Sequence, residues 1–221
     1  TVLLTTSTEK AKVKTTFKEM HMSKDAIVEQ MKQNFLSNTM EDIQSTFIPG
    51  LFYLKNFFNP RMLQAVNNFL LHTEDLPWRD PMLIQGKYFD NHRQTLTWFP
   101  HPMFETLYDV LNSLTAQLNT LLNTSCNFKH AYFWKDNKNF NMQKHIDNPI
   151  IACSLQIYLT KNLDSSFGTT FYHKGQEFIT IPDMNCGYLL DNSKEKIWHA
   201  PTRQLPTGIT RYSLYAIWGN E

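Results

Sequence analysis

The sequence predicts an α+β fold in which helices come first and short strands follow. Amphipathic helical patterns prevail up to Asn123, whereas from Asn127 onward short β-branched and aromatic runs alternate with Asn, Asp, Gly and Pro. Hydrophobic residues make up 42% of the 221 residues and charged residues only 19%, so a sizeable core is available. We therefore expect the strands to form a sandwich or barrel that packs against the helices.

The first 45 residues are expected to lie apart from this domain, which would span residues 46–221. Residues 1–22 are rich in Thr and Lys and have little periodicity, which is typical of an arm. Ser23 can cap a helix over 24–36, in which Ile27, Met31 and Phe35 share one stripe.

Two further helices are predicted in the first half of the domain. The apolar stretch 47–58 is expected to form a strand that leads into a turn, and Asn59-Pro60 is a typical helix start. Two β-like stretches, 82–89 and 94–99, come next. Pro102 then opens a long helix whose Leu-rich stripe continues to Leu121.

The second half of the domain is expected to consist of eight short strands. Each combines β-branched or aromatic residues with flanking turn residues. The predicted strands lie near 128–134, 142–147, 151–160, 169–173, 176–181, 186–191, 196–199 and 209–218. Asp191-Asn192, which precedes His199, is interpreted as a turn, and the alternative is that it supports the side chains of a nearby site.

Composition excludes several classes of protein. The seven glycines form no dinucleotide-binding, Walker A or nucleophile-elbow motif, and the three cysteines form no CxxC pair. No apolar run is long enough to cross a membrane, so no membrane partner is expected. A formal charge of +1 gives no basic surplus for nucleic acid. The few, scattered cysteines favour a reducing compartment, and we expect an intracellular, cytoplasmic protein.

Three residues form a candidate metal site. His145 and Asp147 are two positions apart in a predicted strand, so both side chains would point to the same face. His199 lies on a later predicted strand. Two histidines and one carboxylate are the facial triad that binds non-haem Fe(II) and leaves positions open for chemistry.

A second candidate site residue is Arg211, which stands in a nearly unbroken apolar strand over 209–218. A guanidinium group buried in such a strand needs an anionic partner, and its planar fork fits a carboxylate. That carboxylate could belong to a bound dicarboxylate. Alternation places Ser213 on the same face as Arg211.

At these residues the sequence resembles the Fe(II)/2-oxoglutarate-dependent oxygenases, and within them the prolyl hydroxylase branch. The matching segments, in chain order, are HIDNP at 145–149, SLQIYLT at 154–160, GTTFY at 168–172, Pro182 with GYLL at 187–190, His199, and TRY at 210–212 continuing to Trp218. The resemblance covers roughly residues 130–218. It implies a double-stranded β-helix, or jelly-roll, core with supporting N-terminal helices.

The resemblance also implies a role for each matching residue. His145, Asp147 and His199 would bind Fe(II), and Arg211 would bind the distal carboxylate of the cosubstrate 2-oxoglutarate. Further candidates for binding the cosubstrate are Tyr158, Ser213 and Thr169. The oxidant would be O2.

The implied function is that of a dioxygenase which hydroxylates an unactivated C–H bond. Its substrate would be a residue of a protein or peptide, such as a prolyl residue, or an amino-acid-like small molecule. The balanced charge disfavours a nucleic-acid hydroxylase or demethylase, and so does Ile217, which occupies the position where that branch carries a second arginine. A non-catalytic β-helix binding module is the remaining alternative, although such modules normally lack one or more of the three ligands.

Overall fold

The computed structural model describes residues 43–79, 83–84, 87–88 and 92–220. The predicted arm and the predicted helix over 24–36 lie outside the described residues. The division into 1–45 and 46–221 stays a prediction. No helix among the described residues has the length and apolar character needed to cross a membrane.

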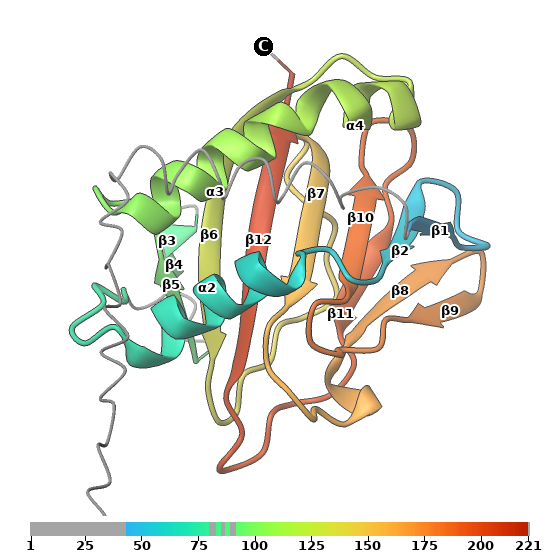
Figure 1. Ribbon diagram of the computed structural model, residues 1–221. Helices are drawn as coiled ribbons and strands as arrows, with labels where there is room; N and C mark the ends of the chain where they lie inside the picture. Colours follow the sequence, from blue (N-terminus) through green and yellow to red (C-terminus); the bar gives the residue numbers. More distant parts are fainter. Residues whose placement is uncertain (1–42, 80–82, 85–86, 89–91, 221) are drawn as a thin grey trace, which may run out of the picture.

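A seven-stranded antiparallel sheet forms the centre of the molecule (Figure 1). Its strands, from one edge to the other, are β1 (Ile43–Ser45), β2 (Leu51–Leu54), β10 (Gly187–Asp191), β7 (Ile151–Tyr158), β12 (Arg211–Gly219), β6 (Asn127–Asp136) and β5 (Arg93–Leu96). Several neighbours, such as β2 and β10, are far apart in sequence, so the sheet joins both halves of the chain.

Two smaller sheets complete the β structure. One contains β11 (Trp198–Pro201), β8 (Thr169–His173) and β9 (Gln176–Ile179) in that order, after the short 3-10 helix η1 (Ser165–Phe167). The other is the pair β3 (Leu83–Ile84) and β4 (Lys87–Tyr88). The fold is therefore a mixed α+β fold with antiparallel sheets, as the sequence predicts.

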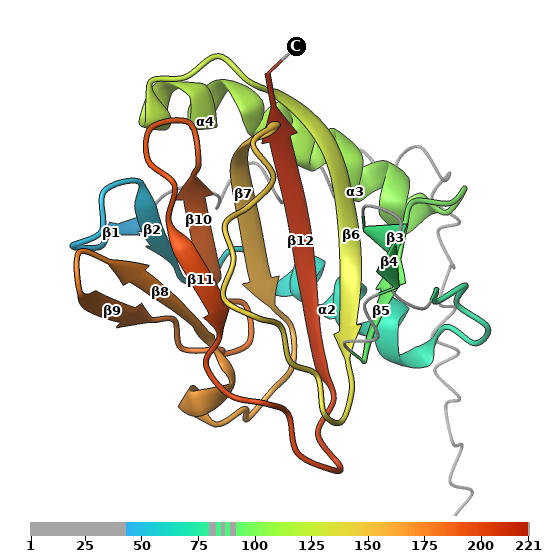
Figure 2. The same cartoon turned by 180° about the vertical axis from the view of Figure 1, so that it is seen from behind.

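Among the described residues, three helices cover one face of the large sheet. They are α2 (Pro60–His72), α3 (Pro102–Ser113) and α4 (Thr115–Leu122), and all three lie on the same side in Figures 1 and 2. Asn59 caps α2, since its side chain accepts a hydrogen bond from the backbone N–H of Met62 (2.9 Å). The apolar stripes of the helices pack on Phe133, Leu214 and their neighbours to form the main core.

The predicted long helix from Pro102 to Leu121 is in fact two helices that meet at Leu114. The Ser113 hydroxyl donates a hydrogen bond to the carbonyl of Val110 (2.7 Å). A side-chain bond of this kind competes with the backbone hydrogen bonds of the helix. This competition explains why an unbroken apolar stripe does not produce one continuous helix.

The predicted strand over 142–147 is wrong. Only His145 in this segment pairs with another strand, through a single bridge to His199, and the rest of the segment is irregular. The segment is polar and runs into Asn148-Pro149, where a strand cannot continue easily. The other predicted strands of the second half correspond to observed strands, one with the predicted bounds (β8) and the others with shifted ends.

The opposite face of the large sheet carries polar and aromatic side chains. At one end it meets the three-stranded sheet, and Phe171 of β8 packs there against Tyr188 and Leu190 of β10. Toward β12 and β6 this face lies on the side away from the helices (Figure 2). The fold thus places an apolar core on one face and a polar site on the other.

Candidate active site

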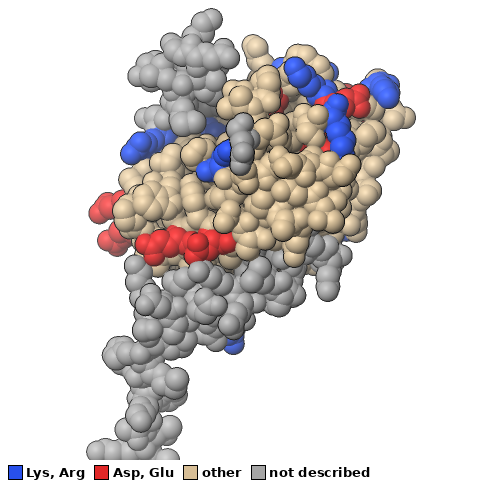
Figure 3. Space-filling model, turned by 90° about the horizontal axis from the view of Figure 1, so that it is seen from above, with Lys and Arg blue, Asp and Glu red and all other residues tan. Residues whose placement is uncertain are grey.

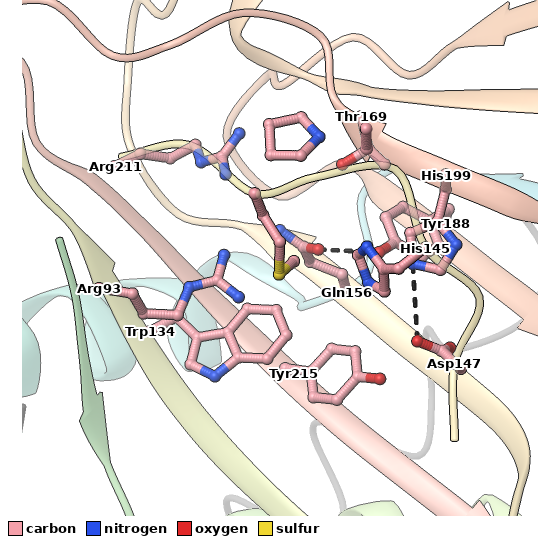
Figure 4. A pocket seen from close by; sticks show the side chains of 13 residues that line it. Arg93, Trp134, His145, Asp147, Gln156, Thr169, Tyr188, His199, Arg211 and Tyr215 are labelled. Carbon is pink, nitrogen blue, oxygen red and sulfur yellow. Dashed lines mark hydrogen bonds and ion pairs between the residues drawn. The ribbon is translucent and has the colours of Figure 1, made fainter. Parts of the chain in front are cut away.

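His145, Asp147 and His199 come together as the sequence predicts. One potential ligand atom from each lies within 4.8 Å of the others. The Nε2 atom of His199 is 3.5 Å from Oδ1 of Asp147, as Figure 4 shows. His145 and Asp147 belong to the irregular segment, whereas His199 belongs to β11.

The reason for this convergence differs from the predicted one. Strand alternation does not bring His145 and Asp147 together, because their segment is not a strand. Instead, the backbone N–H of each histidine donates to the carbonyl of the other, over 2.9 and 2.8 Å. This two-bond bridge places the two imidazole rings 4.4 Å apart.

The two imidazoles are held in the same tautomer. Nδ1 of His145 lies 2.9 Å from the carbonyl oxygen of Gln143, and Nδ1 of His199 lies 3.2 Å from that of Ile197. Because a carbonyl can only accept, both Nδ1 atoms donate, and Nε2 is left as the basic nitrogen. Burial, and next the nearby His199, lower the pKa of His145, which favours its neutral, ligating form.

The carboxylate of Asp147 is also fixed in orientation. The hydroxyl of Ser154 (2.8 Å) and the side-chain amide of Asn192 (3.0 Å) both donate to Oδ2. Oδ1 is thereby turned toward His199. Asn192 therefore lies in the predicted turn and also supports a candidate ligand, which is the alternative that the sequence left open. Two imidazoles and one oriented carboxylate fit a divalent transition metal such as Fe(II).

Arg211 lies in the same pocket as the three candidate ligands, and its side chain is 2% exposed. Within the chain its anionic partner is Asp136, which the sequence did not identify, and the binding of a dicarboxylate by Arg211 stays a prediction. Oδ2 of Asp136 accepts from Nε (3.1 Å) and Nη2 (2.8 Å) of Arg211. Nη1 of Arg211 donates to the carbonyl of Phe167.

The other predicted cosubstrate residues lie at different depths. Thr169 lines the pocket with Arg211. Tyr158 is fully buried behind it and exchanges hydrogen bonds with the hydroxyls of Thr169 (2.8 Å) and Thr180 (2.9 Å). Ser213 is buried, and its hydroxyl accepts from the amide of Gln156 (3.3 Å). The structure thus brings Thr169 to the pocket wall and places Tyr158 and Ser213 among the residues that surround it.

Several pocket residues were not predicted from the sequence. The wall also includes Arg93, Trp134, Met142, Gln156, Tyr188 and Tyr215, most of which are visible in Figure 4. The Tyr188 hydroxyl donates to the amide oxygen of Gln156 (2.9 Å), and Trp134 stacks on Tyr215 with ring centroids 4.1 Å apart. Strand alternation could have found Gln156, because it lies two positions from both Ser154 and Tyr158.

Sequence comparison does not assign the chain to a family. No protein-family model matches it, and no curated protein sequence matches it.

Solved structures do resemble the fold. A prolyl-4-hydroxylase from Pseudomonas putida is 13% identical, with a TM-score of 0.61 over 88% of this chain and 99% of that chain. A prolyl hydroxylase from Trichoplax adhaerens, solved with a hypoxia-inducible-factor peptide, is 12% identical, with a TM-score of 0.62 over 89% and 90%. HygX from Streptomyces hygroscopicus, solved with nickel, 2-oxoglutarate and hygromycin B, is 14% identical, with a TM-score of 0.58 over 77% and 82%.

These likenesses identify the fold as that of the 2-oxoglutarate- and Fe(II)-dependent oxygenases, including prolyl hydroxylases. The resemblance seen in the sequence is therefore confirmed at the level of the fold. At 12–14% identity the fold does not by itself determine the reaction, so the function must be argued from the site.

Proposed function

We propose that this protein is an Fe(II)- and 2-oxoglutarate-dependent dioxygenase built on a double-stranded β-helix, and that it hydroxylates an unactivated C–H bond. One observation carries the proposal: a two-histidine, one-carboxylate cluster shares a pocket with a buried arginine. The cluster suits Fe(II), and the arginine suits the distal carboxylate of a keto-diacid.

In this proposal each residue of the chain has a defined part. His145, Asp147 and His199 hold Fe(II), and Arg211 and Thr169 receive the distal carboxylate of 2-oxoglutarate. Tyr158 keeps the hydroxyl of Thr169 in place from behind. Fe(II), together with 2-oxoglutarate and O2, supplies oxidative decarboxylation to succinate and CO2 coupled to C–H hydroxylation.

The proposed substrate is a prolyl or other residue of a protein, or an amino-acid-like small molecule. Support comes from structures of similar fold, of which two are prolyl hydroxylases and one holds hygromycin B. Ser213 lies beside Gln156, on the same face of the sheet as Tyr215, so it is a candidate support for the pocket wall rather than a direct ligand.

Two alternatives have less support. A nucleic-acid substrate would need a basic binding surface. Figure 3 shows one face of the molecule, seen from above relative to Figure 1, and on this face the basic side chains form separate groups, some of them next to acidic ones, and not one continuous surface. A non-catalytic binding module is disfavoured because all three candidate ligands are present and oriented.

Metal and cosubstrate binding can be tested together by anaerobic titration with Fe(II) and 2-oxoglutarate. The wild-type protein is expected to develop the weak visible charge-transfer band of the Fe(II)–keto-acid chelate. His199→Ala should abolish this band, because the variant loses one of three protein ligands. His173→Ala, which removes a histidine paired with Glu195 outside the pocket, is the matched control. A band of full strength in His199→Ala would remove that residue from the site.

The substrate class can be tested by measuring succinate release with peptides, free amino acids and oligonucleotides. Stimulation by a peptide or an amino acid supports the proposed class. Stimulation by oligonucleotides alone, with binding that weakens steeply as salt rises, would support the nucleic-acid alternative instead.

A further inference from the structure

Three charged residues occupy one row across three neighbouring strands of the large sheet. In the strand register, Asp136 of β6 lies opposite Arg93 of β5 on one side and opposite Arg211 of β12 on the other. The fractional exposure is 8% for Arg93, 0% for Asp136 and 2% for Arg211. The row is thus an arginine–aspartate–arginine cluster buried in the pocket wall.

Asp136 holds both guanidinium groups side by side. It accepts from Nε (2.5 Å) and Nη2 (3.0 Å) of Arg93 as well as from Arg211. The guanidinium carbon of Arg93 also lies 3.6 Å from the ring centroid of Trp134 and 4.4 Å from that of Phe140. Both arginines line the pocket, and Figure 4 shows their guanidinium groups pointing toward the same region.

Asp136 is shared between two arginines. The formal charges of the two guanidinium groups and the carboxylate sum to +1, whereas those of Arg211 and Asp136 alone sum to zero. Arg93 therefore brings a second guanidinium group, with its own N–H donors, to the pocket wall that holds Arg211.

We propose that Arg93 is a second anchor for the distal carboxylate of 2-oxoglutarate, which binds between the two guanidinium groups that Asp136 holds. The inference rests on the proposed function and adds a binding residue to it. The formal charges of Fe(II), Asp147, the arginine–aspartate–arginine cluster and the dianionic cosubstrate would sum to zero.

The test compares two keto acids that differ at one end. 2-Oxopentanoate has the same carbon chain as 2-oxoglutarate, but it ends in a methyl group instead of a carboxylate. Binding of each to the anaerobic, Fe(II)-loaded protein is measured by calorimetry, and the ratio of the two affinities gives the carboxylate preference. Arg93→Met is expected to lower this preference about tenfold or more and to leave binding of 2-oxopentanoate almost unchanged.

Two further variants make the result decisive. Lys135→Met removes a positive charge from the neighbouring position of β6, on the opposite face of the strand, and is expected to keep the wild-type preference. If Arg93→Met does not fold, Arg93→Gln gives the same comparison, because an amide can still donate to Asp136 while the positive charge is lost.

The possible outcomes separate the inference from the proposed function. A wild-type preference that Arg93→Met or Arg93→Gln leaves unchanged would overturn the role of Arg93 alone. An equal loss of both keto acids would overturn it too, since that pattern indicates a purely structural role. A wild-type protein that binds neither keto acid would instead contradict the proposed function.

Discussion

Single hydrogen bonds determine how the candidate metal ligands are presented. Asp147 has two carboxylate oxygens, and the donors Ser154 and Asn192 both occupy Oδ2. The carboxylate therefore cannot rotate freely, and its second oxygen is kept toward His199. Side chains that hydrogen-bond to a metal ligand, as Ser154 and Asn192 do here, often affect metal affinity almost as much as the ligands themselves.

We predict that Ser154→Ala weakens Fe(II) binding about 10- to 100-fold, because the carboxylate of Asp147 loses one of the two bonds that orient it. Affinity can be measured anaerobically by competition with a chelating dye. Ser165→Ala, at an exposed position of η1, is the matched control. Equal affinity in wild type and Ser154→Ala would show that this hydroxyl has no part in presenting the ligand.

The carboxyl group of Asp136 is buried, and its ionised form is stabilised by the two arginines that contact it. Burial alone would raise the pKa of its carboxyl, but the charges of Arg93 and Arg211 outweigh burial and lower it. We predict that Asp136→Asn lowers the free energy of unfolding by about 3–5 kcal/mol, since two buried guanidinium groups would lose their counter-charge. Urea unfolding followed by circular dichroism measures this change, and a loss below roughly 1 kcal/mol would contradict it.

At the scale of elements, the pocket wall depends on how closely β10 approaches β7. A Cβ atom built on Gly187 would lie only 1.8 Å from the backbone carbonyl oxygen of Gln156. No side chain, however small, fits there without a shift of one strand. The same strand pair carries Tyr188 and Gln156, which bond to each other in the pocket.

We predict that Gly187→Ala destabilises the protein by about 1–3 kcal/mol, because the added methyl group must push β10 away from β7. Thermal unfolding measures the effect. Ala200→Gly, which removes a methyl group in β11 instead of adding one, is a useful comparison at another strand of the pocket. An unchanged midpoint for Gly187→Ala would show that the strands can separate there without cost.

Elements also show where sequence reasoning works and where it does not. Strands with strong apolar runs, such as β7 and β12, are predicted well because their residues are buried on both faces. The segment around His145 is not the strand that the pattern predicts, although His145 and Asp147 do lie beside His199. Its single bridge to His199 depends on a long-range contact that no local pattern contains.

At the scale of the whole molecule, the candidate metal ligands could be predicted but the anion partner could not. The need of Arg211 for a negative charge follows from its apolar strand, whereas the identity of Asp136 depends on the pairing of β12 with β6. Arg93 depends on one further pairing, that of β5 with β6. Strand order is a global property, so the complete charge cluster becomes visible only in the folded molecule.

The same cluster should influence acid stability. Because the folded-state pKa of Asp136 is lowered, its contribution to stability is present above the ordinary carboxyl pKa, roughly 4, and is lost as the pH falls toward the folded-state value. We predict that the difference in unfolding free energy between wild type and Asp136→Asn shrinks below about pH 4. Urea unfolding between pH 2.5 and pH 7, a range of roughly 4.5 units chosen to bracket that value, measures the difference. A difference that stays constant over this range would contradict the assignment.

The proposed function requires that His145, Asp147 and His199 hold one metal ion, with a keto-diacid beside it. A crystal structure of the protein prepared anaerobically with Fe(II) and 2-oxoglutarate is the decisive test. We expect an anomalous peak for iron in contact with Nε2 of both histidines and with Asp147, and a distal carboxylate that faces Arg211. Iron bound elsewhere, or a keto acid whose distal carboxylate points away from Arg211, would contradict it.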